Sequence, residues 1–221
     1  MKKLHLKDPA SALTHIIGSA TALLISIPLL IQLARTSDSL HLISLGIFSF
    51  GLVLLYTASS LYHSINSTET INRRLKKFDH MSISILIAST YTPICLIVLG
   101  GRTGWTLFIV IWAMALAGIC LKAFWIYCPR WVSSVIYIAM GWMCIFAFPQ
   151  LLANLSGPAF GWLLAGGVIY TVGGVIYALK LPVFNSIHKK FNSHDIFHLF
   201  CLGGSFCHFV LMYVYVAKMP I

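Results

Sequence analysis

Charged side chains are scarce in this chain of 221 residues. Lys, Arg, Asp and Glu together make up 9% of the sequence, and only five residues are acidic. A soluble globular domain has roughly a quarter of its residues charged, so this composition excludes a water-facing protein. With 59% hydrophobic residues and a mean hydropathy of +0.89, the chain is predicted to be an integral membrane protein.

The sequence also lacks a spaced cysteine motif. Its six cysteines lie in or beside apolar runs, except Cys128, which is expected in a loop. This pattern excludes a disulfide framework and a cysteine-based zinc site, and we interpret the cysteines as small packing residues. No stretch is rich in Pro and Ser, of low complexity or repeated at a fixed period. We therefore expect a single domain over residues 1–221.

Seven apolar runs are long enough to cross a bilayer as helices, since about 20 residues span roughly 30 Å of hydrocarbon. None of them contains Lys or Arg in its interior. The ten-residue alternating segments of a membrane β-barrel are absent. The sequence predicts an all-α, polytopic bundle of seven transmembrane helices, at about 12–34, 40–63, 79–99, 105–121, 131–153, 160–179 and 196–217.

Basic residues are distributed unequally between the two predicted sides of the membrane. Twelve fall on the side of the N-terminus and three, Arg35, Arg102 and Lys218, on the other. This bias predicts a cytoplasmic N-terminus and an external C-terminus in the plasma (inner) membrane. It also explains the net charge of +10 without a nucleic-acid partner. Oligomeric state is not indicated.

Histidines and one carboxylate gather at the cytoplasmic ends of three runs. Ser59 and His63 are four residues apart, as are His194 and His198, and Asp79 opens the third run. Residues four apart share a helix face. Each group alone also fits an interfacial role, and Asp79 also fits a helix N-cap. Their common depth favours a three-histidine metal site with an open position for water.

Two further histidines are candidates for supporting roles. His15 is expected either to donate a hydrogen bond to one of the metal-binding residues or to lie at the level of the lipid headgroups. His208 is about 15 Å beyond His198 along the helix, too deep to bind the same ion but able to line the same cavity. Asp195 is expected to be a solvent-facing or helix-start carboxylate. Ordinary loop or interface positions are expected for His5, His41, His80 and His188.

Several segments resemble the hemolysin III proteins, the bacterial branch of the progestin and adipoQ receptor family. They include residues 59–63 (SSLYH), 77–79 (KFD), 194–198 (HDIFH) and 207–209 (CHF), with 14–18 and 88–93 in addition. The resemblance implies a seven-helix bundle that holds zinc in its cytoplasmic half. It implies that His63, His194 and His198 are the ligands, that Asp79 holds a zinc-bound water, and that Ser59 has the position of the family's serine.

One departure from the family pattern concerns the segment before the first helix. Bacterial members often carry glutamate a few residues before the helix-1 histidine, whereas this chain has Asp8 in the segment 7–12 (KDPASA). Asp8 either substitutes for that acid or has no part in the site.

The predicted chemistry is zinc-dependent hydrolysis of a lipid amide or related acyl bond. Three neutral histidines lower the pKa of a zinc-bound water to about 7. Asp79 would act as the general base and Ser59 as a hydrogen-bond donor to the oxyanion or to Asp79. One alternative is a receptor-like sensor of membrane lipid state with a structural metal. A pore-forming cytolysin is disfavoured by the retained spans, the cytoplasmic bias and the expected lack of a secretion signal.

Overall fold

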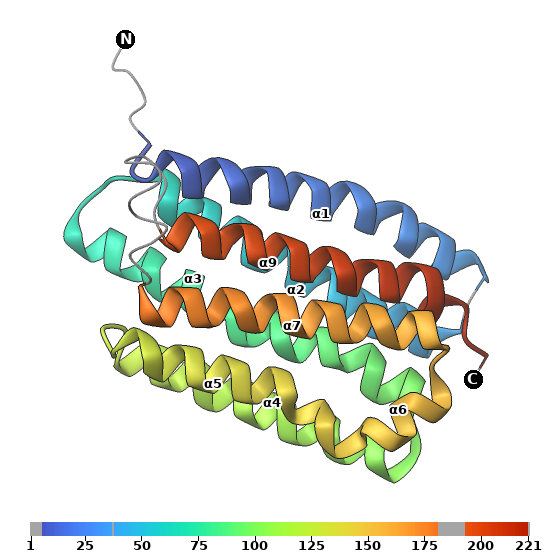
Figure 1. Ribbon diagram of the computed structural model, residues 1–221. Helices are drawn as coiled ribbons and strands as arrows, with labels where there is room; N and C mark the ends of the chain where they lie inside the picture. The colour runs from blue at the N-terminus through green and yellow to red at the C-terminus, as the bar shows by residue number, and fades with distance from the viewer. Residues whose placement is uncertain (1–5, 37, 181–192, 221) are drawn as a thin grey trace.

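The computed structural model describes residues 6–36, 38–180 and 193–220, and all regular structure in these ranges is helical. Seven helical segments there are long and apolar enough to cross a membrane. They run along a common direction and form an elongated bundle (Figure 1). The prediction of an all-α, seven-span membrane protein is confirmed.

The first two spans are α1 (Pro9–Thr36) and α2 (Ser39–Ser64). Pro28 lies within α1, which remains one continuous helix. Asp38 caps α2, because its side chain accepts hydrogen bonds from the backbone N–H groups of Leu40 and His41 at 2.7 and 3.0 Å. This cap fixes the start of α2 at the end of the bundle opposite His63.

The third span comprises α3 (Glu69–Pro93) and a π-helical continuation, η1 (Ile94–Leu99). The predicted start at Asp79 was wrong: the helix begins ten residues earlier, after the N-cap Thr68. Hydropathy marks where a helix enters hydrocarbon, but the intervening Arg and Lys residues are good helix formers and extend it into the polar region. Asp79 therefore lies inside a helix and is not an N-cap.

The fourth span is α4 (Gly101–Phe124), and the fifth is interrupted. The run predicted as one helix at 131–153 consists of α5 (Arg130–Trp142), a 3-10 segment η2 (Met143–Ala147) and α6 (Phe148–Asn154). Pro149 sits in the first turn of α6. Proline has no backbone N–H and crowds the preceding turn, so the α-helical hydrogen bonds cannot continue through this point.

The last two spans are α7 (Gly157–Leu179) and α9 (Ser193–Val210), the latter extended by η3 (Leu211–Tyr215) and η4 (Val216–Lys218). Glycines of α7 let α7 and α9 approach closely. A Cβ atom at Gly166 would lie 2.3 Å from the His208 ring, and one at Gly173 would lie 2.6 Å from Phe200.

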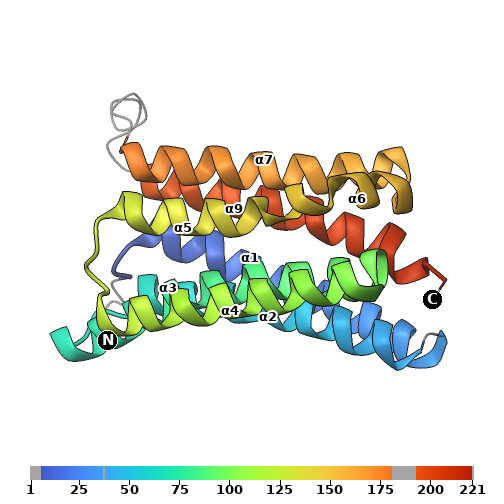
Figure 2. The ribbon, with the colours of Figure 1, turned by 90° about the horizontal axis from the view of Figure 1, so that it is seen from below.

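The spans pack in chain order around a ring, and α9 closes the ring against α1. Figure 2 shows α7 along one side of the bundle and α2, α3 and α4 along the other. The end of α2 and the start of α9 lie at the same end of the bundle (Figure 1). This topology brings His63 to the same level as His194 and His198.

Candidate metal centre

Three histidines from two helices converge at one end of the bundle. His63 lies in the last turn of α2, and His194 and His198 are one turn apart at the start of α9. One ring nitrogen from each lies within 4.8 Å of the other two. The ring centroids are 4.6–5.0 Å apart. The structure thus brings together the trio that the sequence singled out, and the trio could hold a metal ion.

A row of polar residues at the start of α1 contacts all three imidazoles. Asp8 Oδ2 lies 2.9 Å from His63 Nδ1, Ser11 Oγ 3.4 Å from His194 Nδ1, and Thr14 Oγ1 3.4 Å from His198 Nδ1. In this row Ser11 and Thr14 are three apart on one face of α1, and Asp8, directly before the helix, continues the same spacing. Each ring therefore turns its Nδ1 atom toward α1.

The environment of His63 fits a bound cation. An ionised carboxylate can only accept hydrogen bonds, so His63 Nδ1 carries the proton and donates to Asp8. Its Nε2 atom is buried and has no hydrogen-bond partner among the described residues. A buried polar atom left without a partner costs about 1–3 kcal/mol, and a metal ion would offset that cost. A set of imidazole nitrogens suits zinc and other transition metals.

Two polar groups predicted for the reaction lie on a cavity beside the trio. Ser59 and Asp79 are both buried, and both line a cavity of about 140 Å³ that is also lined by His194 and His198. His80, expected to be an ordinary interface residue, lines the same cavity. Its Nδ1 atom is 3.1 Å from Asp79 Oδ2, although the two do not have hydrogen-bond geometry.

His15 is buried in the interior of the site. Its ring stacks on that of His198 with centroids 3.6 Å apart and planes 8° apart. The ring is buried, and neither nitrogen has a hydrogen-bond partner among the described residues. This stacking fixes the plane of the His198 ring from the α1 side.

Asp195 differs from its predicted exposure. It lies in the first turn of α9, which agrees with the predicted helix-start position. However, it is buried and accepts a 2.5 Å hydrogen bond from Ser11 Oγ. The solvent-facing alternative was wrong because Ser11 of α1 covers this side of α9. Ser11 therefore contacts both Asp195 and His194, which ties the start of α9 to α1.

Lys7 covers the outer edge of the site. Its ammonium lies 3.5 Å from the centroid of the Tyr62 ring, beside His63. Burial against this surface lowers the pKa of Lys7 from its ordinary value, and the nearby Asp8 charge opposes that shift. The polar end of the bundle is thus closed around His63 by residues that precede α1.

The wall of the cavity changes character with depth. Polar groups line its metal-site end, while aliphatic and aromatic side chains such as Leu55, Leu86, Ile87 and Trp142 form much of the remainder. His208 also lines it, far from the trio along α9. A polar end joined to an apolar passage is the shape expected for an amphiphilic ligand.

Comparison with known proteins places this arrangement in a family. Residues 4–209 match the family described as Haemolysin-III related. The chain belongs to this family. It is 39% identical to the hemolysin-3 homolog of Bacillus subtilis (strain 168), over 97% of this chain and 96% of that one. It is 37% identical to the hemolysin-3 of Bacillus cereus, over 95% and 92% of the two chains.

A more distant similarity joins the haemolysin-III chain to eukaryotic receptors. The adiponectin receptor protein of Drosophila melanogaster is 21% identical over 89% of this chain and 48% of its own length. The chain thus spans about half of that receptor. This similarity supports the relation to the progestin and adipoQ receptor family that the sequence motifs indicated.

Sequence reasoning missed part of the site in this haemolysin-III family member. Ser11, Thr14 and His80 were not singled out, and the role of Asp8 was left open. A signal for the α1 residues was present, because polar side chains at 8, 11 and 14 recur with helical spacing. His80 carried no such signal, since its side chain reaches the cavity only through the packing of α3 in the ring.

Proposed function

We propose that this protein is a zinc-dependent hydrolase that cleaves an amide or related acyl bond of a membrane lipid. The observation that carries the proposal is the three-histidine cluster, two of whose members, His194 and His198, line the same cavity as buried Asp79. Three protein ligands, such as three histidines, with a fourth position open for water or substrate are the pattern of catalytic zinc sites.

Zinc held by three neutral imidazoles supplies a Lewis acid that acidifies water and polarises a carbonyl group. Within that site Asp79 accepts the proton of the attacking water through a carboxylate oxygen and then returns it to the leaving amine. Ser59 donates a hydrogen bond to the oxygen of the carbonyl group as negative charge develops there. The His80 ring, whose Nδ1 atom lies 3.1 Å from Asp79 Oδ2, limits the positions that this carboxylate can take.

A lipid substrate is supported by the location of the site. The cavity lies within seven membrane-spanning segments, and apolar side chains line the part that leads away from the histidines. An acyl chain can occupy that part while its polar linkage remains at the metal-site end. Water-soluble substrates would gain little from such a wall.

We place the site on the cytoplasmic side of the membrane. Among the described residues, the end of the bundle that holds the histidines carries eight basic residues, and the other end carries three. The eight are Lys7, Arg73, Arg74, Lys76, Lys77, Lys122, Arg130 and Lys180. Basic residues concentrate on the cytoplasmic side of membrane proteins.

A second candidate function is a lipid-state sensor in which the metal has a structural role. The trio joins α2 to α9, two helices that both pack on α1. A metal at this point would hold the ring closed where its last helix meets its first two. Such a role requires the histidines but not a base at position 79.

Hydrolysis by wild type and Asp79→Asn separates these functions. The asparagine keeps the size of the side chain but cannot accept the proton, so turnover of long-chain lipid amides should fall about 10²–10⁴-fold. Bound zinc and melting temperature should stay close to those of wild type. Asp38→Asn, at the opposite end of the bundle, is the matched control and should keep full turnover.

Each outcome distinguishes the two accounts. Equal hydrolysis by wild type and Asp79→Asn would remove Asp79 from the reaction. If wild type hydrolysed none of a broad panel of lipid amides and esters but lost thermal stability with its metal, the structural role would be supported.

A further inference from the structure

His208 is a buried imidazole deep in the bundle, remote from the trio. It is ten residues after His198, which corresponds to about 15 Å along α9. Its side chain is 8% exposed and lies among apolar and aromatic groups. A polar ring at this depth is costly unless it serves a ligand or another part of the protein.

The hydrogen bonding of His208 defines what it can bind. Its Nε2 atom is 3.3 Å from the backbone carbonyl oxygen of Leu163. A carbonyl oxygen only accepts, so Nε2 carries the proton and donates. In that tautomer Nδ1 is an acceptor, and it is buried without a hydrogen-bond partner among the described residues. The matching group is therefore an O–H or N–H donor.

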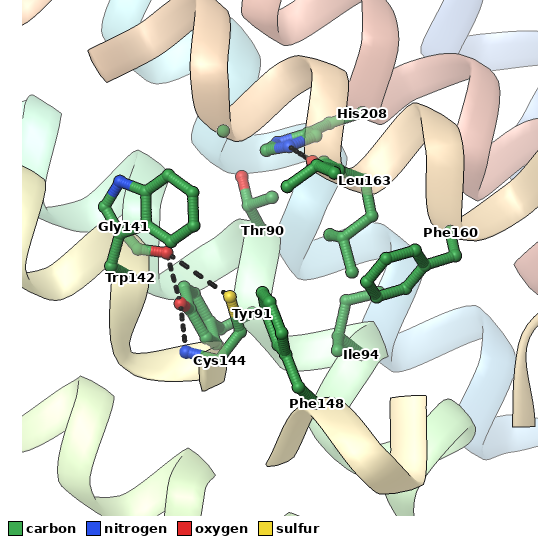
Figure 3. A pocket seen from close by; sticks show the side chains of 12 residues that line it. Thr90, Tyr91, Ile94, Gly141, Trp142, Cys144, Phe148, Phe160, Leu163 and His208 are labelled. Atoms are coloured by element: carbon green, nitrogen blue, oxygen red, sulfur yellow. Dashed lines mark hydrogen bonds between the residues drawn. The ribbon is translucent and has the colours of Figure 1, made fainter. Parts of the chain in front are cut away.

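His208 lies where two cavities meet. It lines the large cavity that begins at the metal site and also a smaller one of about 50 Å³, together with Thr90, Tyr91 and Trp142. Figure 3 shows the His208 ring and the Thr90 side chain on facing sides of this space. Thr90 donates its hydroxyl proton to the carbonyl of Leu86 at 2.9 Å, so it does not satisfy His208 Nδ1.

The neighbouring helix accommodates this ring closely. A Cβ atom at Gly166 of α7 would lie 2.3 Å from His208 Nε2, so only glycine leaves room for the ring in its present position. The Tyr170 ring, one turn further, lies 5.5 Å from it, and the Tyr170 hydroxyl is engaged with Ser205 at 2.7 Å. The ring is thus held in place at the cavity wall, and its buried Nδ1 acceptor is left without a partner among the described residues.

We infer that His208 is a second binding point of the cavity, which accepts a hydrogen bond from a hydroxyl group on the acyl chain of the bound lipid. The inference rests on the proposed function for the nature of the ligand. The separation of His208 from the trio, about 15 Å, matches the extended length of a medium acyl chain. A chain whose carbonyl end lies at the metal site would bring a hydroxyl at its far end to His208.

Binding of two acids that differ in one hydroxyl group tests the inference. The full-length, zinc-loaded protein in lipid nanodiscs would be titrated with dodecanoate and with ω-hydroxydodecanoate, and Kd measured for each. Wild type should bind the hydroxy acid about five- to tenfold more tightly, the worth of one hydrogen bond in a buried site. His208→Leu should abolish that preference, and His208→Gln, which retains an acceptor, should restore part of it.

Cys207→Ala is the matched control, because Cys207 is buried on the same turn but lines neither cavity; it should keep the preference. Zinc content should be the same in all four proteins. Equal affinity of wild type for the two acids, or no binding of either, would overturn the inference. So would a preference that survives in His208→Leu.

A hydrolysis assay keeps this inference separate from the proposed function. Cleavage of an unsubstituted dodecanoyl amide without any hydroxyl preference in binding would remove only the role of His208. A hydroxyl preference that depends on His208, without hydrolysis of amides of either acid, would remove only the hydrolase.

Discussion

The carboxylate of Asp8 accepts a 2.9 Å hydrogen bond from His63 and so joins the residue before α1 to the last turn of α2. The bond fixes the tautomer of His63, with Nδ1 protonated and Nε2 left to face the other histidines. A carboxylate behind a metal-binding histidine also raises the basicity of the ring. Ser11 and Thr14 continue the same row toward the other two rings.

Removal of the Asp8 carboxylate should weaken zinc binding without removing a ligand. For Asp8→Ala we expect a 10–100-fold loss of zinc affinity, as is usual when a partner of a metal-binding histidine is lost. Asp8→Glu, which keeps the carboxylate, should recover part of it. Zinc affinity would be measured by competition with a chelator in detergent.

The control for Asp8 is Ser19→Ala. Ser19 also joins α1 to α2, through a 2.7 Å hydrogen bond to Thr57, but it does not contact the histidines. It should bind zinc as wild type does. An unchanged affinity in Asp8→Ala, or equal losses in the two variants, would show that the Asp8 contact does not position His63.

Gly166 should tolerate no side chain. In Gly166→Ala the new methyl group would lie 2.3 Å from the His208 ring, and we expect a loss of about 1–3 kcal/mol from overpacking. Gly161→Ala on the same helix is the comparison, because in the described part of the chain no atom outside the helix lies within 4 Å of its Cβ position. That variant should be neutral or more stable by up to about 1 kcal/mol, from helix propensity. Thermal unfolding in detergent measures both, and similar melting temperatures for the two would contradict this account.

The proposed orientation predicts where inserted tags face. A reporter fused after Ile221 should behave as external, and one inserted between Asn66 and Ser67, in the connection from α2 to α3, should behave as cytoplasmic. The unequal distribution of basic residues is the physical reason. A cytoplasmic C-terminal reporter would invert the orientation and move the metal site to the outer side.

Much of the fold could be predicted because hydropathy alone locates membrane spans. The residues at which helices begin and end could not be predicted as well from hydropathy. α3 begins at Glu69 and not at Asp79, since a helix does not end where hydrocarbon ends. The fifth span is broken around Pro149, a break that the apolar run conceals.

The trio could be predicted from two simple facts. Residues four apart share a helix face. Four spans lie between the end of α2 and the start of α9, and an even number of spans returns the chain to the same side of the membrane. The contacts of Asp8, Ser11 and Thr14 with the histidines could not be predicted, because they depend on how α1 is rotated against α2 and α9. The burial of Asp195 has the same origin: Ser11 supplies the hydrogen bond that makes a buried carboxylate acceptable.

Zinc content of the purified protein tests the central claim most directly. Wild type should contain one zinc per chain, and the double variant His194→Ala/His198→Ala, which keeps only His63 of the trio, should contain almost none. The single variant His208→Ala should keep its zinc, because that ring lies too deep in the bundle to reach the ion. One zinc in wild type and His208→Ala with none in the double variant is the result we predict; the same zinc content in the double variant and wild type would contradict the three-histidine site.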